Sequence, residues 1–226
     1  MRPRNPLNHV PVHERLRTGI LLALVGGFLD AYTFILRGGV FANAQTGNMV
    51  LMGISIAGGE WLKALYYLVP IFAFFAGVLV TEGIKKHHTG TGLVRWEHIV
   101  LMIEILLLLA IGFLPLSVPN AVVNVTISFV CSMQVNSFRM MKGNPYATTM
   151  CTGNLRSAAE LFFQFLTEKD KAAGRKCGSY FIIILAFCAG AALGAVLCGL
   201  FAAKAVWFCC ALLLCVLLIM LYTKPR

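Results

Sequence analysis

Long apolar runs alternate with short polar stretches along most of the chain. A helix needs about 20 mostly apolar residues to cross the hydrocarbon core of a bilayer. The pattern predicts an all-α membrane helix bundle that forms a single domain over residues 18–222, with tails at 1–17 and 223–226. Six runs are long enough for us to expect transmembrane helices there: 18–36, 62–83, 97–116, 119–140, 178–201 and 204–222.

Two further apolar stretches, 48–58 and 155–166, are too short to cross, because a helix rises only about 1.5 Å per residue. We expect each of them to enter and leave on one side as a re-entrant or broken helix, or to lie in the membrane interface. A re-entrant backbone is tolerated at membrane depth only where it is buried in protein or lines a cavity.

Composition supports a membrane protein and excludes other classes. Hydrophobic residues make up 59% of the 226 positions and charged residues only 12%, whereas about a quarter of the residues in a soluble domain are charged. The mean hydropathy of +0.81 excludes a soluble globular domain, a disordered chain and a nucleic-acid-binding module. The expected partner is therefore the lipid bilayer and not a nucleic acid.

The 19 Lys and Arg residues indicate the orientation. If the chain crosses six times, 16 of them fall in the tails and loops of one side, and 3 fall on the other side. Loops rich in Lys and Arg stay in the cytoplasm, so we expect a multi-pass protein whose N- and C-termini are cytoplasmic. A crossing by either short stretch would destroy this alternation. The net charge of +10 thus reports orientation and identifies no partner.

A short motif occurs twice, as Thr46-Gly47-Asn48 and as Thr152-Gly153-Asn154, 106 residues apart. The same offset places Asp30 against Asn136. Each half, 18–116 and 119–222, would contain three spans, so the second half is predicted to be inverted relative to the first. Inverted repeats with interrupted helices are typical of secondary transporters, which bind substrate at the repeat interface. The alternative is a duplicated bundle that does not transport.

The motif also has chemistry of its own. Thr and Asn are good N-caps, and Gly permits a sharp entry into a helix. The first N–H groups of the following helix lack partners and carry partial positive charge. Two such helix starts that face each other would form a polar site that tolerates anions. The alternative is that Thr46, Asn48, Thr152 and Asn154 only cap their own helices.

Several polar residues fall inside the expected spans. Asp30 lies well inside the first helix, where a carboxylate is costly and is a functional candidate by default. It could couple transport to protons, or it could be a structural anchor paired with Arg139 or Gln134. Gln134 and Asn136 are placed to form hydrogen bonds between helices, and Asn136 is the repeat counterpart of Asp30.

Glu104, in the third expected span, is a secondary candidate. It could hold a proton, or it could reach toward Arg95 or His98 near the cytoplasmic end, which is the interpretation we favour. Gly190 and Gly194 form a GxxxG pattern that lets backbones pack closely. We expect internal packing there, with a homo-oligomer contact as the alternative.

Nothing in the sequence indicates a cofactor, a metal site or an enzyme. No ligand set with standard zinc spacing is present, and no histidine lies deep in a span.

The combination of motifs resembles one family. The residues that carry the resemblance are Gly26–Phe34, Gly38–Phe41, Gln45–Gly53, Met133–Arg139 and Thr148–Leu155. They are similar to the YoaK-like family of uncharacterised bacterial membrane proteins, and the likeness extends over about 18–222. The resemblance implies a six-span protein of the bacterial plasma (inner) membrane, and it supplies no substrate or reaction.

We therefore expect a small secondary transporter for a small polar or anionic solute, with proton coupling through Asp30 as one option. The two motifs, with Gly47 and Gly153 at their centres, would frame its site together with Gln134, Asn136 and Arg139. The alternative is a membrane scaffold or sensory partner that does not transport.

Overall fold

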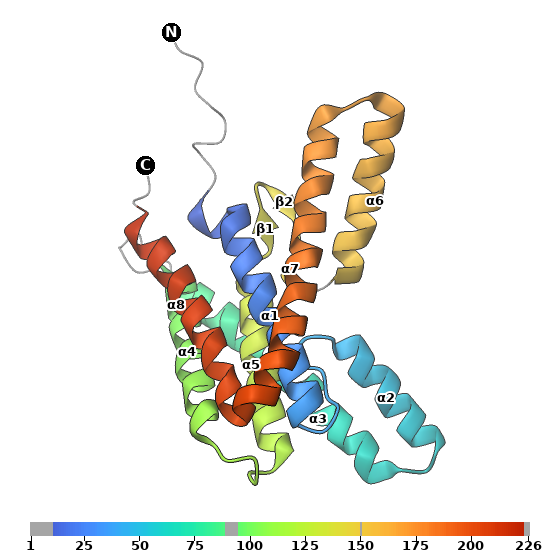
Figure 1. Ribbon diagram of the computed structural model, residues 1–226, viewed down its shortest axis with the longest axis vertical. Coiled ribbons are helices and arrows are strands. Elements are labelled where there is room, and N and C mark those ends of the chain that lie inside the picture. The colour runs from blue at the N-terminus through green and yellow to red at the C-terminus, as the bar shows by residue number, and fades with distance from the viewer. Residues whose placement is uncertain (1–10, 89–94, 150, 224–226) are drawn as a thin grey trace.

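The computed structural model describes residues 11–88, 95–149 and 151–223 (Figure 1). The predicted tails at 1–17 and 223–226 therefore lie partly outside the described residues. The described part is almost entirely helical, which confirms the all-α prediction. Its α-helices are α1 (Leu16–Leu36), α2 (Gln45–Ala57), α3 (Trp61–His87), α4 (Trp96–Phe113), α5 (Asn120–Ser137), α6 (Cys151–Glu168), α7 (Lys171–Phe201) and α8 (Trp207–Tyr222).

The remaining elements are short. Two 3-10 turns, η2 (Val12–Glu14) and η3 (Ala202–Val206), precede α1 and α8. An antiparallel hairpin of β1 (Met140–Met141) and β2 (Asn144–Pro145) follows α5. The predicted helix limits need one notable correction, because α7 begins at Lys171, seven residues before the expected start of its span.

In the described part of the chain, four helical segments are long and apolar enough to cross a membrane. They are Leu16–Leu36, Trp61–His87, Trp96–Phe113 and Lys171–Tyr222, the last of which contains α7 and α8. The helix α5 is not among them, although we predicted a span there. Its asparagines, glutamine and serines lower its hydropathy, and most of these side chains are buried inside the bundle.

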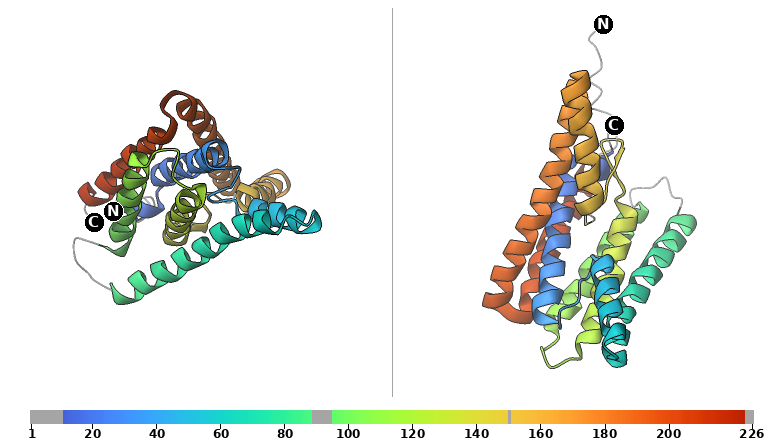
Figure 2. Two further views of the ribbon diagram at one scale, coloured as in Figure 1. Left: turned by 90° about the horizontal axis from the view of Figure 1, so that it is seen from below. Right: turned by 90° about the vertical axis from the view of Figure 1, so that its right-hand side faces the viewer.

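The helices α1 and α5 form the centre of the bundle (Figure 2). α1 packs mainly against α7 and also contacts α8, while α5 packs mainly against α3 and also contacts α4. The short helix α2 lies against α3, and α6 lies against α7. Helices about 106 residues apart correspond to each other: α1 to α5, α2 to α6, α3 to α7 and α4 to α8. When corresponding helices are exchanged, the pair α1–α7 becomes α5–α3, α1–α8 becomes α5–α4, and α2–α3 becomes α6–α7. The two halves of the chain therefore have matching helix contacts.

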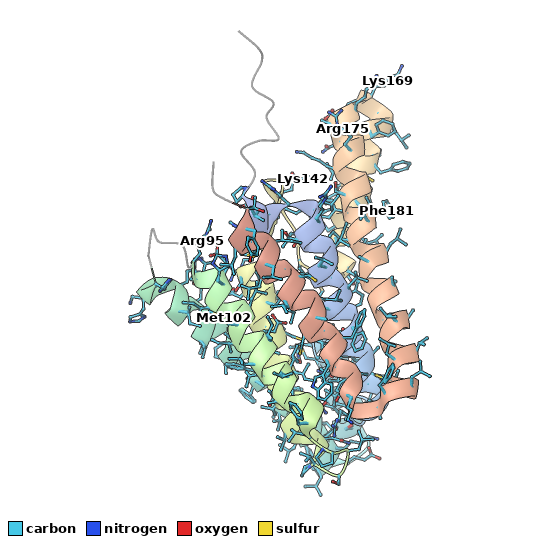
Figure 3. All side chains as sticks on the ribbon, turned by 60° about the vertical axis from the view of Figure 1, so that its left-hand side comes forward. Arg95, Met102, Lys142, Lys169, Arg175 and Phe181 are labelled. Carbon is cyan, nitrogen blue, oxygen red and sulfur yellow. The ribbon has the colours of Figure 1, made fainter. Side chains whose placement is uncertain are left out.

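The two short helices begin near the middle of the molecule and run toward opposite ends (Figures 1 and 2). Their observed limits, Gln45–Ala57 and Cys151–Glu168, include all of the predicted stretch 155–166 and all of 48–58 except its last residue, Gly58, which is the C-cap of α2. The first residues of α2 and α6 are 106 positions apart, the offset of the motif repeat. Labelled basic residues from three different loops and from the start of α7, namely Arg95, Lys142, Lys169 and Arg175, lie at one end of the bundle (Figure 3).

Glycines allow α1 and α7 to approach closely. A Cβ atom at Gly27 would overlap the carbonyl oxygen of Phe187, and a Cβ atom at Gly190 would overlap that of Leu24. Gly194 faces Phe28 of α1 in the same way. The GxxxG pattern is therefore used inside the chain, as expected, and its glycines do not support a homo-oligomer contact.

Candidate functional site

Asn48 and Asn154 make the same unusual contact in the two halves of the chain. The side chain of Asn48 accepts a hydrogen bond from the backbone N–H of Phe41 at 3.0 Å and donates one to its carbonyl oxygen at 2.7 Å. Asn154 does the same with the backbone of Ala147, at 3.2 Å and 2.6 Å. In both halves the partner lies seven residues earlier, and the two partners are again 106 residues apart.

This contact corrects our capping hypothesis. Asn48 lies inside α2, whose N-cap residue Ala44 makes no side-chain capping bond, and Asn154 lies in the first turn of α6. Each asparagine closes the loop that leads into its helix, because one amide satisfies both backbone groups of a single residue. The motif thus determines where the two short helices begin.

The other motif residues are less constrained. Thr46 and Thr152 are exposed, and their hydroxyl groups have no hydrogen-bond partner among the described residues. A Cβ atom at Gly47 would contact the ring of Phe41, whereas nothing lies within 4 Å of that position at Gly153. The two threonines are therefore accessible to a solute or to lipid, and the two asparagines are not.

The loop that leads into α2 and the loop that leads into α6, which we call the two entry loops, both contact Gly26 of α1. The Asn43 side chain donates a hydrogen bond to the Gly26 carbonyl oxygen at 3.1 Å, and the methyl group of Thr149 occupies the space that a Cβ atom at Gly26 would need. Asn43 and Thr149 are also 106 residues apart. The starts of α2 and α6 therefore approach the same point of the central helix.

Asp30 lies next to this point. Its Oδ1 accepts a hydrogen bond from the backbone N–H of Asn43 at 2.7 Å, and the residue as a whole is 6% exposed. The carboxylate therefore stands at the entry to α2, where backbone N–H groups favour negative charge.

The structural partners that we considered for Asp30 are occupied elsewhere. The Arg139 guanidinium lies 3.4 Å from Glu82, and the Asn136 side chain donates to the same carboxylate at 2.9 Å. Gln134 donates to Thr148 and to the backbone of α1. Gln134 thus joins the centre of the bundle to an entry loop, while Asn136 and Arg139 form a separate cluster with Glu82.

Glu104 also differs from our favoured interpretation. It reaches neither Arg95 nor His98, because Arg95 forms an ion pair with Glu97 at 2.7 Å and the His98 ring bonds to the Arg95 backbone. Glu104 is fully buried on α4, and neither carboxyl oxygen has a hydrogen-bond partner among the described residues.

Arg37 is the main residue that the sequence did not reveal. It follows α1 directly and looks like a loop residue, yet it is fully buried. None of its three side-chain nitrogens makes a hydrogen bond of good geometry among the described residues, and the hydroxyl group of Tyr32 is a polar neighbour of the guanidinium. Its carbonyl oxygen is held by Tyr66 at 2.6 Å and by Asn124 at 2.9 Å. The only sequence signal was its position between an apolar run and two glycines.

At the start of α1 a second cluster joins η2 to α4. The His13 ring lies 3.8 Å from the carboxylate of Glu97, which is itself buried. Burial lowers the pKa of His13, and this effect outweighs the attraction of Glu97, which acts in the opposite direction. Among the described residues, no group of three or more His, Cys, Asp or Glu side chains is arranged to hold a metal ion.

Apolar spanning helices around buried polar groups define a polytopic helical membrane protein. Comparison with known proteins assigns it further. The sequence pattern described as "Protein of unknown function (DUF1275)" matches residues 18–219, and the chain belongs to that family. The UPF0700 transmembrane protein YoaK of Bacillus subtilis (strain 168) is 25% identical over 179 residues, which cover 76% of this chain and 78% of that protein. No solved structure is significantly similar to the chain.

Proposed function

We propose that this protein is a small proton-coupled secondary transporter for a small anionic solute in the bacterial plasma membrane. The observation that carries the proposal is the presence of three buried ionisable side chains, Asp30, Arg37 and Glu104, in the bundle. None of them forms a salt bridge within the described residues.

Such groups are expensive in a purely structural bundle. Removing a charged side chain from water costs several kcal/mol unless it is paired, and intramembrane charges usually mark ion or substrate pathways. A scaffold would be more stable with apolar residues of similar volume at these positions. Buried acceptor atoms without partners, on Asn43, Asn124 and Gln134, are further polar groups available to a solute.

The topology that we propose is six spans in two inverted halves with cytoplasmic termini. Matching pairings of the helices, matching asparagine contacts and the opposite directions of α2 and α6 support it. The polar helix α5 would be the sixth span, shielded from lipid by its neighbours. The gathering of basic residues at the end where α1 begins and α8 ends supports a cytoplasmic location for that end (Figure 3).

Each charged group then has a role. Asp30 would take up and release the coupling proton at the entry to α2, close to the start of α6. Glu104 would be a second proton site, since it is fully buried and neither of its carboxyl oxygens has a hydrogen-bond partner among the described residues. Arg37 would pair with the anion, because a guanidinium offers five N–H donors and its nitrogens make no hydrogen bond of good geometry among the described residues.

A ligand-dependent thermal-shift screen on purified protein tests this proposal. Small carboxylates, inorganic phosphate and other small anions are compared with neutral solutes of similar size. We expect at least one anion to raise the unfolding temperature of the wild type and of Glu160→Gln, a control on exposed α6. Asp30→Asn keeps the hydrogen-bond acceptor for Asn43 and should fold, but stabilisation by the anion should depend less steeply on pH, because Glu104 is then the one proton site left.

Two results would contradict the proposal. If no anion stabilises the wild type, while the protein unfolds cooperatively, the scaffold alternative is favoured. If an anion stabilises Asp30→Asn with the same pH dependence as the wild type, Asp30 is not the coupling residue.

A further inference from the structure

A hollow with three basic side chains opens at the end of the bundle where α1 begins. Its volume is about 360 Å³, and it is lined by Arg15, Leu16, Arg17 and Lys142. Arg15 and Arg17 come from the start of α1, while Lys142 comes from the turn between β1 and β2, more than 120 residues later (Figure 3). The fold therefore brings together charges that are far apart in the sequence.

Backbone hydrogen bonds hold the two segments in place. The backbone N–H of Lys142 donates to the carbonyl oxygen of Glu14 at 2.8 Å, which fixes the turn beside the first residues of α1. The Thr18 hydroxyl donates to the carbonyl oxygen of Val12 at 2.8 Å and fixes η2. Lys142 has a positive φ of 50°, a conformation that non-glycine residues adopt infrequently. The arrangement of the three cations is thus built into the fold.

No ion pair among the described residues neutralises these three cations. No salt bridge or side-chain hydrogen bond of Arg15, Arg17 or Lys142 occurs in the described part of the chain. Arg15 is also the N-cap residue of α1 and makes no capping bond, so the partial positive charge of the helix start adds to theirs. One anion in the hollow would relieve all of these repulsions together.

We infer that this hollow binds a phosphate group, and its position points to the headgroup of an anionic membrane lipid. Two guanidinium groups and one ammonium suit the oxygens of a phosphate, and basic pockets at the cytoplasmic ends of membrane helices bind such headgroups. The apolar run of α1 begins directly after Arg17, so the hollow lies at the membrane boundary. Leu16 supplies an apolar wall for the glycerol end of the lipid.

The test uses the full-length protein in a neutral detergent and three probes: short-chain phosphatidylglycerol, short-chain phosphatidylcholine and inorganic phosphate. Binding is measured by native mass spectrometry and by the shift in unfolding temperature. Lys142→Asn removes one charge and places a residue that tolerates positive φ. Lys169→Asn is its matched control, because Lys169 is an exposed lysine with a φ of 52° at the same end of the bundle.

We expect phosphatidylglycerol to bind the wild type and the Lys169→Asn control more tightly than phosphatidylcholine does. Lys142→Asn should weaken the binding of phosphatidylglycerol about fivefold, which corresponds to about 1 kcal/mol for one basic residue near a headgroup. Arg17→Gln should produce a loss of similar size. Binding of inorganic phosphate with the same dependence on Lys142 would support the site and indicate that a free phosphate can also occupy it.

Equal binding of the two lipids to the wild type would overturn the inference. So would an equal effect of Lys142→Asn and Lys169→Asn, because the charge would then act from anywhere on this end of the molecule. Neither outcome depends on whether the protein transports a solute.

Discussion

Replacing Asn48 or Asn154 with alanine should destabilise the protein by a similar amount in either half. Each substitution removes two hydrogen bonds to one backbone residue, with lengths between 2.6 and 3.2 Å. Asn48→Ala also removes the bond that Asn48 donates to Gln45 Oε1 at 2.9 Å, which adds little because Gln45 is only partly buried. A net hydrogen bond contributes about 0.5–1.5 kcal/mol, and a buried group left without a partner costs about 1–3 kcal/mol. Because Phe41 and Ala147 are residues of intermediate burial, we expect a loss of about 1–3 kcal/mol for each variant.

Aspartate variants at the same positions test whether the side-chain N–H donor of each asparagine is needed. Asn48→Asp and Asn154→Asp keep the shape and the bond accepted from the backbone N–H. They replace the donor with an oxygen that faces a carbonyl oxygen, so they should be no more stable than the alanine variants. Thr46→Ala and Thr152→Ala are the matched controls, because these threonines belong to the same motifs but are exposed and make no side-chain bond among the described residues. They should change stability by less than about 0.5 kcal/mol.

Thiol labelling during denaturation in detergent provides the assay. Cys131 and Cys209 are buried, so a thiol-reactive dye reports their exposure as the bundle opens. The reasoning is refuted if both alanine variants lie within about 0.5 kcal/mol of the wild type. A large loss in one half and none in the other would contradict the equivalence of the two loops.

Two further predictions concern packing and pH. Gly190→Ala should destabilise the protein by about 1–3 kcal/mol, because the new methyl group would overlap the backbone of α1. Gly199→Ala is the control on the same helix and should be tolerated, because no described atom lies within 4 Å of the new methyl group. Equal losses of stability in the two variants would contradict the close contact between α1 and α7. Because the pKa of His13 is lower in the folded protein than its ordinary value of about 6.5, the unfolded chain binds the proton more readily and stability should fall as the pH drops below that value. His13→Gln should make the free energy of unfolding depend less steeply on pH. Denaturation curves measured between about pH 5 and 8, the range in which histidine titrates, test this. The same dependence in the wild type and the variant would contradict the burial of His13.

The location of the helices followed from the sequence because apolar runs in membrane helices are long and continuous. The sequence also indicated where α2 and α6 begin, since the repeated Thr-Gly-Asn motif lies at the start of both helices. The charge asymmetry allowed orientation to be proposed in the same way. These signals are local, so a single sequence contains them.

The contacts of the candidate site were not predictable in the same way. The Asn48 side chain bonds to the backbone of Phe41, seven residues earlier. Almost any residue type at position 41 would offer the same backbone groups, so the identity of that residue does not predict the contact. Arg37 resembles a loop residue, and its burial depends on helices far along the chain. We considered Arg139 as one of two alternative structural partners of Asp30, but Glu82 of α3 binds it, because α3 packs on α5 in the folded bundle.

Solute uptake into proteoliposomes with an imposed pH gradient tests the central claim most directly. The solute is the anion that gives the largest thermal shift, and the variants are Asp30→Asn and the control Glu160→Gln. We expect the wild type and the control to accumulate the anion only when the gradient is present, and Asp30→Asn not to accumulate it. Accumulation by Asp30→Asn at the wild-type rate, or no accumulation by a folded wild type, would contradict it.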